Sequence, residues 1–533
     1  MKVPVCMATQ HPDSTLYVPV QKEPEEAIEC LTSFECDEYM IDYEGKMTPY
    51  HQSAQIVSDM LNNTKLVPGK DAFITPRMSS AAEEVVFRQM MAIMAIMEAN
   101  YISISRTGSP AVVEAIHPMS KSYQELLKSK ERVYDIMHIA KKELGLKMEW
   151  DQFNIIPLVE QVPQLFSIDD LVGGFIDNHK ASLGFELKGQ RVLLGKSDPA
   201  IGFGHVASAL ACKVAISDLY AISERTGVEC SPIMGAGSLP FRGHLSLENI
   251  GNFISEYSGI RTVTIQSGLR HNHGLEETRK VVRMMKDKLP GSRPAPLSAE
   301  DRDAMMLISA VFAKNYLKAL PGLGSLVSSI SSLIPNQRDR LVQRGSMGYS
   351  REVNDLGKFV SMCSKIPGGR EIARDMLGMG EIKDLPRAIK FTASFYVIGF
   401  PPEFIGTGRG LRELGERLGN DVLDSLLSRY YPSLVHDLEF AGRFLNMKSV
   451  ETFVDSPAVL SLLEQDLAGC IDVLGLKLEP DMGHNALGEM SLPYMRYFLG
   501  GGERVFSDEK ELELKDAIKT LILRMSEKRG SLG

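Results

Sequence analysis

The sequence predicts a (β/α)8, TIM-type barrel that carries a large additional α-helical C-terminal portion. Short apolar runs recur at intervals of roughly 30–50 residues in the first half of the chain, and helical patterns fill the gaps between them. After Asp301 the pattern is mostly helical. Apolar runs without polar alternation are typical of parallel strands buried on both faces. We therefore place a catalytic barrel in residues 1–300 and a helical extension, packed on the barrel, in residues 301–533.

Eight runs are the predicted strands. They are residues 3–8, 38–42, 72–75, 101–105, 154–159, 191–195, 230–235 and 262–266. Helices are expected between them, with examples at 24–31, 81–92, 167–176 and 206–219. A doubly wound open sheet fits less well, because no Gly-x-Gly-x-x-Gly turn follows the first run.

The extension is expected to be a set of helices joined by Gly- and Pro-rich segments. The predicted helices are residues 302–320, 356–363, 411–427, 434–445, 458–474 and 511–528. One joint, 405–410, has the composition of a loop that holds an anion on its backbone N–H groups, although ordinary Gly-rich turns look the same.

Composition limits the class of protein. The formal net charge is −9 and no long basic run occurs, so a nucleic-acid partner is not expected. The seven cysteines are scattered and odd in number, which is typical of reduced thiols in a cytosolic protein. The N-terminus does not have the pattern of a signal peptide, and the apolar run 90–97 is too short to cross a bilayer. We expect a cytoplasmic protein with no membrane partner.

Two acids follow neighbouring predicted strands. Glu160 comes directly after one run and Asp198 follows the next. The strand–helix–strand connection brings both to the carboxyl edge of the sheet, where they could share a hard cation such as Mg²⁺. The alternative is that each acid caps the helix that follows it.

The other strand ends carry mainly Arg, carboxylate and His side chains. These residues are His11, Asp42, Glu44, Arg77, Arg106, Arg242, Arg270, His271 and His273. Guanidinium groups pair bidentately with carboxylate and phosphate, so this set favours an anionic, oxygen-rich substrate, whereas any single arginine could be a surface ion pair. The Gly-rich segment 235–244 is expected to be either a mobile lid or a plain long turn.

Six motifs then occur in one order along the chain. They are Thr9-Gln10-His11-Pro12-Asp13, Pro157-Leu158-Val159-Glu160, Leu194-Gly195-Lys196-Ser197-Asp198, the Gly-rich loop that ends in Arg242, Thr264-Ile265-Gln266, and Gly291-Ser292-Arg293-Pro294-Ala295. In this order they resemble the active-site motifs of phosphoenolpyruvate carboxylase. The modest length and the Thr-Gln-His-Pro-Asp start are similar to the archaeal-type branch of that family.

The resemblance implies a carboxy-lyase that forms oxaloacetate and phosphate from phosphoenolpyruvate and bicarbonate, through carboxyphosphate and a metal-stabilised enolate, in anaplerotic carbon fixation. It implies that Glu160 and Asp198 bind Mg²⁺ or Mn²⁺ and that His11 and Arg242 are catalytic. The substrate-binding residues that it implies are Arg77, Arg293, Arg302 and Arg270. It also implies a homotetramer, with the extension at residues 301–533 contributing to the subunit contacts.

The chain departs from the longer enzymes of the family at two positions. Ile201 stands where they have a lysine, and Ala236 where they have the first arginine of the Gly-rich loop, which leaves Lys196 or His205 as candidate substitutes. Two other functions compete with carboxylation. One is a Mg²⁺-dependent barrel lyase or aldolase acting on a keto acid, and the other is a non-catalytic helical scaffold built on an inactive barrel.

Overall fold

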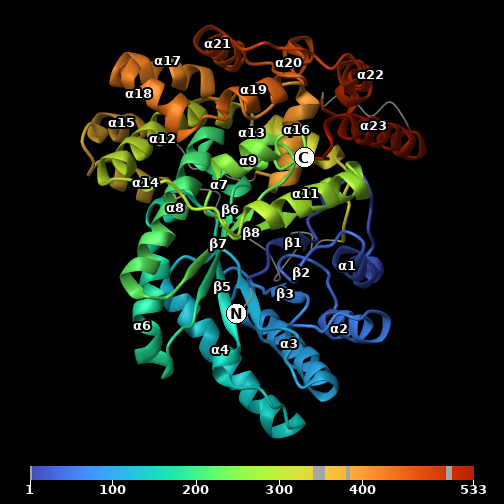
Figure 1. Cartoon of the computed structure of the whole chain (residues 1–533). Helices are drawn as coiled ribbons and strands as arrows, with labels where there is room; N and C mark the ends of the chain where they lie inside the picture. Colours follow the sequence, from blue (N-terminus) through green and yellow to red (C-terminus); the bar gives the residue numbers. More distant parts are fainter. Residues whose placement is uncertain (1–2, 340–354, 380–384, 500–506) are drawn as a thin grey trace.

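The computed structural model describes residues 3–339, 355–379, 385–499 and 507–533. Eight parallel strands pair in chain order and close into a barrel, with β1 paired to β8 (Figure 1). The strands are β1 (Cys6–Thr9), β2 (Glu38–Asp42), β3 (Phe73–Arg77), β4 (Glu114–His117), β5 (Asn154–Val159), β6 (Gln190–Gly195), β7 (Cys230–Gly235) and β8 (Thr262–Ile265). The predicted barrel is confirmed.

One predicted strand is wrong. Residues 101–105 belong to the long helix α3 (Val86–Thr107), which continues until Gly108 takes a left-handed conformation and ends it. The fourth strand is Glu114–His117 instead. A run of Tyr, Ile and Ser favours a strand locally, but here it continues a helix that already buries an apolar face. Arg106 is therefore no strand-end residue, and it hydrogen-bonds Asn62 on the surface.

Helices surround the barrel. They are α1 (Glu23–Thr32), α2 (Gln52–Asn63), α3, α4 (Tyr123–Leu144), α5 (Val162–Phe166), α6 (Gly174–Leu183), α7 (Ser197–Phe203), α8 (His205–Thr226), α9 (Ile250–Glu256), α10 (Ser267–Asn272) and α11 (Leu275–Lys288). The single helix expected at 167–176 is split by a π turn that ends at a Gly pair, Gly173 and Gly174. Among the described residues, α8 alone is long and apolar enough to cross a membrane, and 72% of its most apolar window is buried inside the fold, as in a core helix.

The barrel interior is packed in layers. Arg191, Glu38, Glu114 and Thr262 come from the four even-numbered strands and meet near the amino ends, where Arg191 hydrogen-bonds the other three. Above them lies an apolar cluster of Met7, Met40, Ile116, Ile156, Leu158, Leu193 and Ile233. Side chains from alternate strands fill a closed barrel in this way, so chemistry is confined to the carboxyl ends of the strands.

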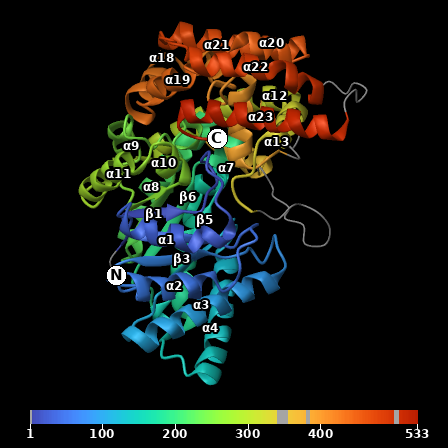
Figure 2. The same cartoon turned by 90° about the vertical axis from the view of Figure 1, so that its right-hand side faces the viewer.

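The extension covers one end of the barrel (Figures 1 and 2). Its helices are α12 (Ala299–Ala319), α13 (Gly324–Leu333), α14 (Leu356–Cys363), α15 (Gly369–Met376), α16 (Ala388–Ile398), α17 (Thr407–Leu418), α18 (Asn420–Ser425), α19 (Leu434–Gly442), α20 (Met447–Phe453), α21 (Pro457–Leu474), α22 (Met482–Leu499) and α23 (Asp508–Arg529). The helix expected at 411–427 is interrupted at Gly419, which has a φ of 92°. The Tyr316 hydroxyl of α12 donates to the carbonyl of Ile201 in the barrel at 2.8 Å.

The Gly-rich joint at 405–410 holds an anion of its own chain. The backbone N–H groups of Gly406 and Arg409 donate to the Asp466 carboxylate at 2.7 and 3.1 Å, and the Arg409 guanidinium pairs with it at 2.8 Å. A Cβ on Gly408 would lie 1.8 Å from the Asp466 carbonyl oxygen. The predicted anion cradle therefore joins α17 to α21 and is already filled.

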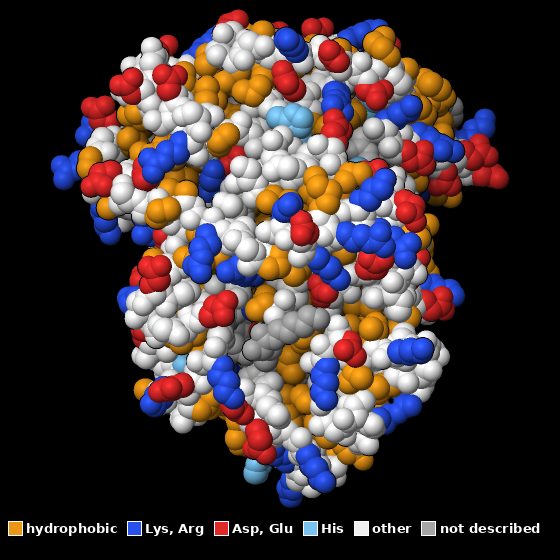
Figure 3. Space-filling view, viewed as in Figure 1, with side chains coloured by type: hydrophobic (Ala, Val, Ile, Leu, Met, Phe, Trp, Pro, Cys, Tyr) orange, Lys and Arg blue, Asp and Glu red, His pale blue; other side chains and the backbone are white. Residues whose placement is uncertain are grey.

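Surface charge is mixed. On the face seen in Figure 3, basic and acidic side chains are interspersed and no extended single-sign surface is formed. A cationic surface of the kind that binds nucleic acid is therefore not a feature of this face.

The seven cysteines are all buried and none is in a disulfide.

Candidate active site

A pocket with a volume of about 90 Å³ lies at the carboxyl ends of the strands. Its lining includes residues that end seven of the eight strands or follow them closely, together with residues 387–389 of the extension. Five of the sequence-predicted residues meet there: His11, Arg77, Glu160, Asp198 and Arg242. The barrel therefore brings together groups that are far apart in the sequence.

Glu160 and Asp198 occupy neighbouring positions on the rim. Glu160 directly follows β5, and Asp198 lies in the first turn of α7 just after β6, the strand paired to β5. A Cβ on Gly195 would lie 3.2 Å from Glu160 Cγ, so the absence of a side chain there leaves room for Glu160. Two carboxylates with open space suit Mg²⁺, which commonly takes one or two carboxylates and keeps water or substrate oxygens as its other ligands. Among the described residues, no group of three or more His, Cys, Asp or Glu side chains forms a fuller metal site.

Arg77 is fixed by carboxylates. Its Nε and Nη2 donate to Asp42 at 2.9 and 2.8 Å, and Nη1 lies 3.1 Å from Glu44. Burial opposes the charge, but Asp42 and Glu44 outweigh it and hold the pKa of Arg77 well above its usual value. Arg77 is a permanent, immobile cation on the pocket wall.

The motif around His11 is held rigidly at the end of β1. Nδ1 of His11 lies 2.8 Å from the Thr9 hydroxyl, and the His11 carbonyl accepts from Ser267 Oγ. Asp13 accepts from the backbone N–H of Gly268 at 2.7 Å, at the start of α10. The imidazole orientation therefore depends on β1 and β8 together.

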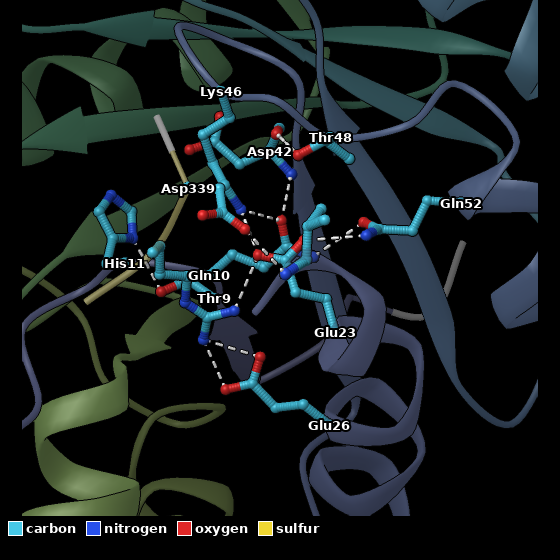
Figure 4. A network of polar contacts seen from close by, with 12 residues as sticks. Thr9, Gln10, His11, Glu23, Glu26, Asp42, Lys46, Thr48, Gln52 and Asp339 are labelled. Carbon is cyan, nitrogen blue, oxygen red and sulfur yellow. Dashed lines mark hydrogen bonds and ion pairs between the residues drawn. The ribbon is translucent and has the colours of Figure 1, made fainter. Parts of the chain in front are cut away.

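A buried polar network supports this motif from behind (Figure 4). Lys46 Nζ donates to Gln10 at 2.9 Å and pairs with Glu23 at 2.5 Å. Arg338, from the extension, pairs with Glu23 at 3.0 Å and with Glu26 at 2.6 Å. The extension thus reaches beneath the His11 loop.

Arg270 belongs to the same network. Its guanidinium donates to the Thr9 carbonyl at 3.0 Å and pairs with Glu26 at 2.8 Å, and only 1% of the residue is exposed. It does not line the pocket. The structure gives Arg270 a supporting contact with the end of β1 in place of a contact with the cavity.

Arg242 lies in a buried loop. Its Nε lies 3.1 Å from Ser197 Oγ, its Nη2 lies 2.5 Å from Gln266 Oε1, and its Nη1 contacts Asp13 and the Gly533 carbonyl. Every residue from 236 to 246 is buried. The segment is a loop that packs against the extension through Phe241 and His244, and it carries Arg242 into the pocket lining.

Comparison with known proteins decides the family. The family model described as phosphoenolpyruvate carboxylase matches residues 3–533. The chain belongs to the phosphoenolpyruvate carboxylase family. The carboxylase of Methanosarcina acetivorans is 42% identical over 533 residues, covering 99% of each chain, and that of Methanopyrus kandleri is 37% identical over 531 residues, covering 99% of this chain and 98% of its own.

A more distant relative and a solved structure extend the comparison. The Leuconostoc mesenteroides carboxylase is 30% identical over 483 residues, covering 87% of this chain and 88% of its own. A solved Haloferax volcanii malate synthase matches 79% of this chain and 97% of its own at 11% identity, with a TM-score of 0.34, a likeness too weak to argue from. The archaeal-type resemblance seen in the motifs is confirmed by the archaeal relatives.

Two predicted arginines of this carboxylase lie outside the pocket. Arg293 is exposed beside the ring of Tyr220, 5.9 Å from its centroid, and Arg302 of α12 pairs with Asp218 of α8. Both follow α11, which returns along the outside of the barrel after β8, so the chain leaves the strand ends before reaching them. Neither arginine lines the pocket, so the pocket does not support their predicted role in substrate binding.

Arg387 of the carboxylase was not predicted as a site residue. It immediately precedes α16 and lines the pocket, and its Nη2 lies 2.2 Å from where a Cβ on Gly45 would be. Gly45, with a φ of 57°, therefore admits the guanidinium over the loop after β2. The sequence around Arg387 has no chemical signature, because only the docking of the extension brings it to the barrel.

Lys196, a candidate substitute for the missing lysine, is buried at the edge of the pocket. Its Nζ donates to the carbonyls of His205 and Phe241, each at 3.4 Å. Burial lowers the pKa of Lys196 to about 8. Phe241 lies in the Gly-rich loop and His205 begins α8, so Lys196 joins that loop to α8 and helps to hold it in place.

Proposed function

We propose that phosphoenolpyruvate and bicarbonate react in this pocket to give oxaloacetate and phosphate. The supporting observation is the convergence of Glu160, Asp198, His11, Arg77 and Arg242 around one cavity at the carboxyl ends of the strands. Cations on the wall suit two anionic substrates, and two carboxylates suit a divalent ion.

Glu160 and Asp198 would hold Mg²⁺ or Mn²⁺. When bound there, the ion would supply positive charge beside the oxygen on which the enolate forms. Both side chains closely follow the ends of two paired strands, so the barrel fixes their separation before any ion binds.

Arg77 and Arg387 would bind the anionic groups of phosphoenolpyruvate. Their guanidinium groups come from β3 and from the residue that precedes α16 in the extension, and both line the cavity. Arg242, on the opposite part of the rim after β7, would offset charge on the phosphoryl group as bicarbonate attacks phosphorus. Positioning and electrostatics supply most of the catalysis in such a transfer.

His11 would act as the general base. Attack of bicarbonate on phosphorus gives carboxyphosphate and the enolate of pyruvate. Removal of the carboxyphosphate proton by His11 would release CO₂ and phosphate, and the enolate carbon would then attack CO₂. The contact with Thr9 holds the imidazole in one orientation. The buried loop 236–246 would keep water from protonating the enolate to pyruvate.

The test is oxaloacetate formation coupled to malate dehydrogenase, with and without bicarbonate and Mg²⁺. For His11→Asn we expect oxaloacetate formation to be lost while some phosphate release continues. Full carboxylation by that variant would exclude the role of His11. Turnover without bicarbonate or phosphate release would favour the keto-acid lyase instead, and no turnover by the wild type would favour the scaffold.

We further propose a cytoplasmic homotetramer, with α3 in a contact between copies. Four large apolar side chains on one side of this helix are exposed: Phe87 (64%), Met90 (39%), Met94 (51%) and Tyr101 (41%). A second copy is the proposed occupant because the resemblance implies self-association, and such faces mark interaction sites. Light scattering should show a smaller particle for Phe87→Asp, and an unchanged mass would place the contact elsewhere.

A further inference from the structure

Two buried carboxylates of the extension hold the loop that carries Arg242. Glu403 accepts from the backbone N–H of Phe241 at 2.8 Å, directly before Arg242. Asp437 lies 2.5 Å from Nδ1 of His244, two residues after Arg242. The loop is therefore fixed on both sides of Arg242 by residues about 160 and 190 positions later in the chain.

The backbone at His244, the residue whose ring Asp437 contacts, is strained. His244 has a φ of 62°, a left-handed conformation that is uncommon for a residue with a side chain, and Gly243 before it has a φ of 120°. The His244 ring is also packed by His436 and Phe440, with centroids 5.6 and 4.6 Å away. A strained conformation persists where its surroundings determine it, and such sites cluster at functional positions.

Asp437 also reaches the other side of the loop. Its second oxygen accepts from the Tyr431 hydroxyl at 2.7 Å, and that hydroxyl lies 2.8 Å from Nε2 of His205 at the start of α8. The His205 carbonyl is one of the two acceptors of Lys196. Burial disfavours a charged Asp437, but His244, His205 and Tyr431 outweigh it and hold the pKa of Asp437 below its usual value.

We propose that Asp437 is a positioning residue for the carboxylation reaction: through His244 and Tyr431 it holds the Arg242 loop closed over the pocket, so that the enolate meets CO₂ and not water. The proposal rests on the proposed role of that loop. Asp437 does not line the pocket, so its effect is carried by the two hydrogen-bonded side chains.

The chain offers a matched control. Asp466 is also buried, 0% exposed against 4% for Asp437, and it also joins two segments through backbone and side-chain contacts. Its partners are Gly406 and Arg409, neither of which lines the pocket. Loss of the Asp466 charge should therefore reduce stability without moving Arg242. A general effect of a buried aspartate can then be separated from positioning.

The experiment compares Asp437→Asn, Tyr431→Phe and Asp466→Asn in the full-length protein. The measurements are the ratio of pyruvate to oxaloacetate formed from phosphoenolpyruvate at saturating bicarbonate, kcat and KM, the melting temperature, and hydrogen exchange of residues 236–246. For Asp437→Asn we expect kcat for oxaloacetate to fall about 10- to 100-fold, a rise of about fivefold or more in the pyruvate share, and faster exchange in the loop. Tyr431→Phe, which removes one hydroxyl, should change the same quantities less, and Asp466→Asn should change only the melting temperature.

An unchanged product ratio in Asp437→Asn, or an equal change in Asp466→Asn, would overturn the proposal. If Asp437→Asn fails to fold, the ratio of pyruvate to oxaloacetate and the hydrogen exchange of residues 236–246 in Tyr431→Phe decide the question. Absence of oxaloacetate from the wild-type protein would count against the proposed function alone, since the exchange measurement still reports whether Asp437 holds the loop.

Discussion

Replacement of Arg191 by Met should destabilise the carboxylase far more than an ordinary loss of an ion pair. Arg191 donates to Glu38 at 2.7 Å and to Glu114 at 2.9 Å inside the barrel, where the three side chains are 5%, 0% and 6% exposed. One guanidinium thus neutralises two buried carboxylates. Removing one partner of a buried pair costs about 3–5 kcal/mol, because it leaves an uncompensated buried charge. That is a large share of the 5–15 kcal/mol that typically stabilises a folded protein.

The matched control is Arg225, which also pairs with two carboxylates, Asp169 at 2.7 Å and Asp177 at 2.8 Å. Those side chains are 45%, 58% and 50% exposed, so solvent screens the pairs and Arg225→Met should cost less than about 1 kcal/mol.

Urea denaturation of both variants at pH 7 and pH 5 measures the difference. Burial already raises the pKa of Glu114, even against Arg191, so in Arg191→Met the lost stability should shrink at the lower pH as the Glu114 carboxylate takes up a proton. Equal costs for the two arginine variants at pH 7 would refute the argument from burial.

Three other predictions concern the site. Glu160→Gln and Asp198→Asn should each raise the Mg²⁺ concentration needed for half-maximal activity by at least about 10- to 100-fold, and an unchanged Mg²⁺ titration would exclude the residue as a ligand. Arg387→Met should raise KM for phosphoenolpyruvate about 10- to 100-fold, since a hydrogen bond to a charged group contributes about 1.5–3 kcal/mol, with KM for bicarbonate as the control. Burial raises the pKa of Glu403 from 4.5 to about 7. Between these two pH values Glu403 keeps its proton in the folded state and loses it in the unfolded chain, so the free energy of unfolding falls as pH rises from 4.5 to 7. Glu403→Gln should therefore gain up to about 3 kcal/mol relative to the wild type between pH 4.5 and 7 in urea denaturation, whereas parallel profiles would contradict the shift.

Much of the barrel was predictable from local pattern. Buried parallel strands require short apolar runs, and the residues that end them must lie at one edge, so Glu160, Asp198 and His11 could be placed together before any coordinates were known. The fourth strand was misplaced because the Tyr-Ile-Ser-Ile-Ser run has strand propensity but lies within a helix that extends to Gly108.

The sequence by itself determined the barrel and the carboxylate pair, because strand period and strand ends are local properties of the chain. Only the tertiary structure placed Arg387 on the pocket wall and Asp437 behind the Arg242 loop, and only it moved Arg293 outside the pocket. The placements of Arg387 and Asp437 depend on how the helical extension docks on the barrel, whereas Arg293 lies outside the pocket because α11 runs back along the outside of the barrel before it. Docking is decided by packing and buried hydrogen bonds between residues far apart in sequence, which no local pattern records.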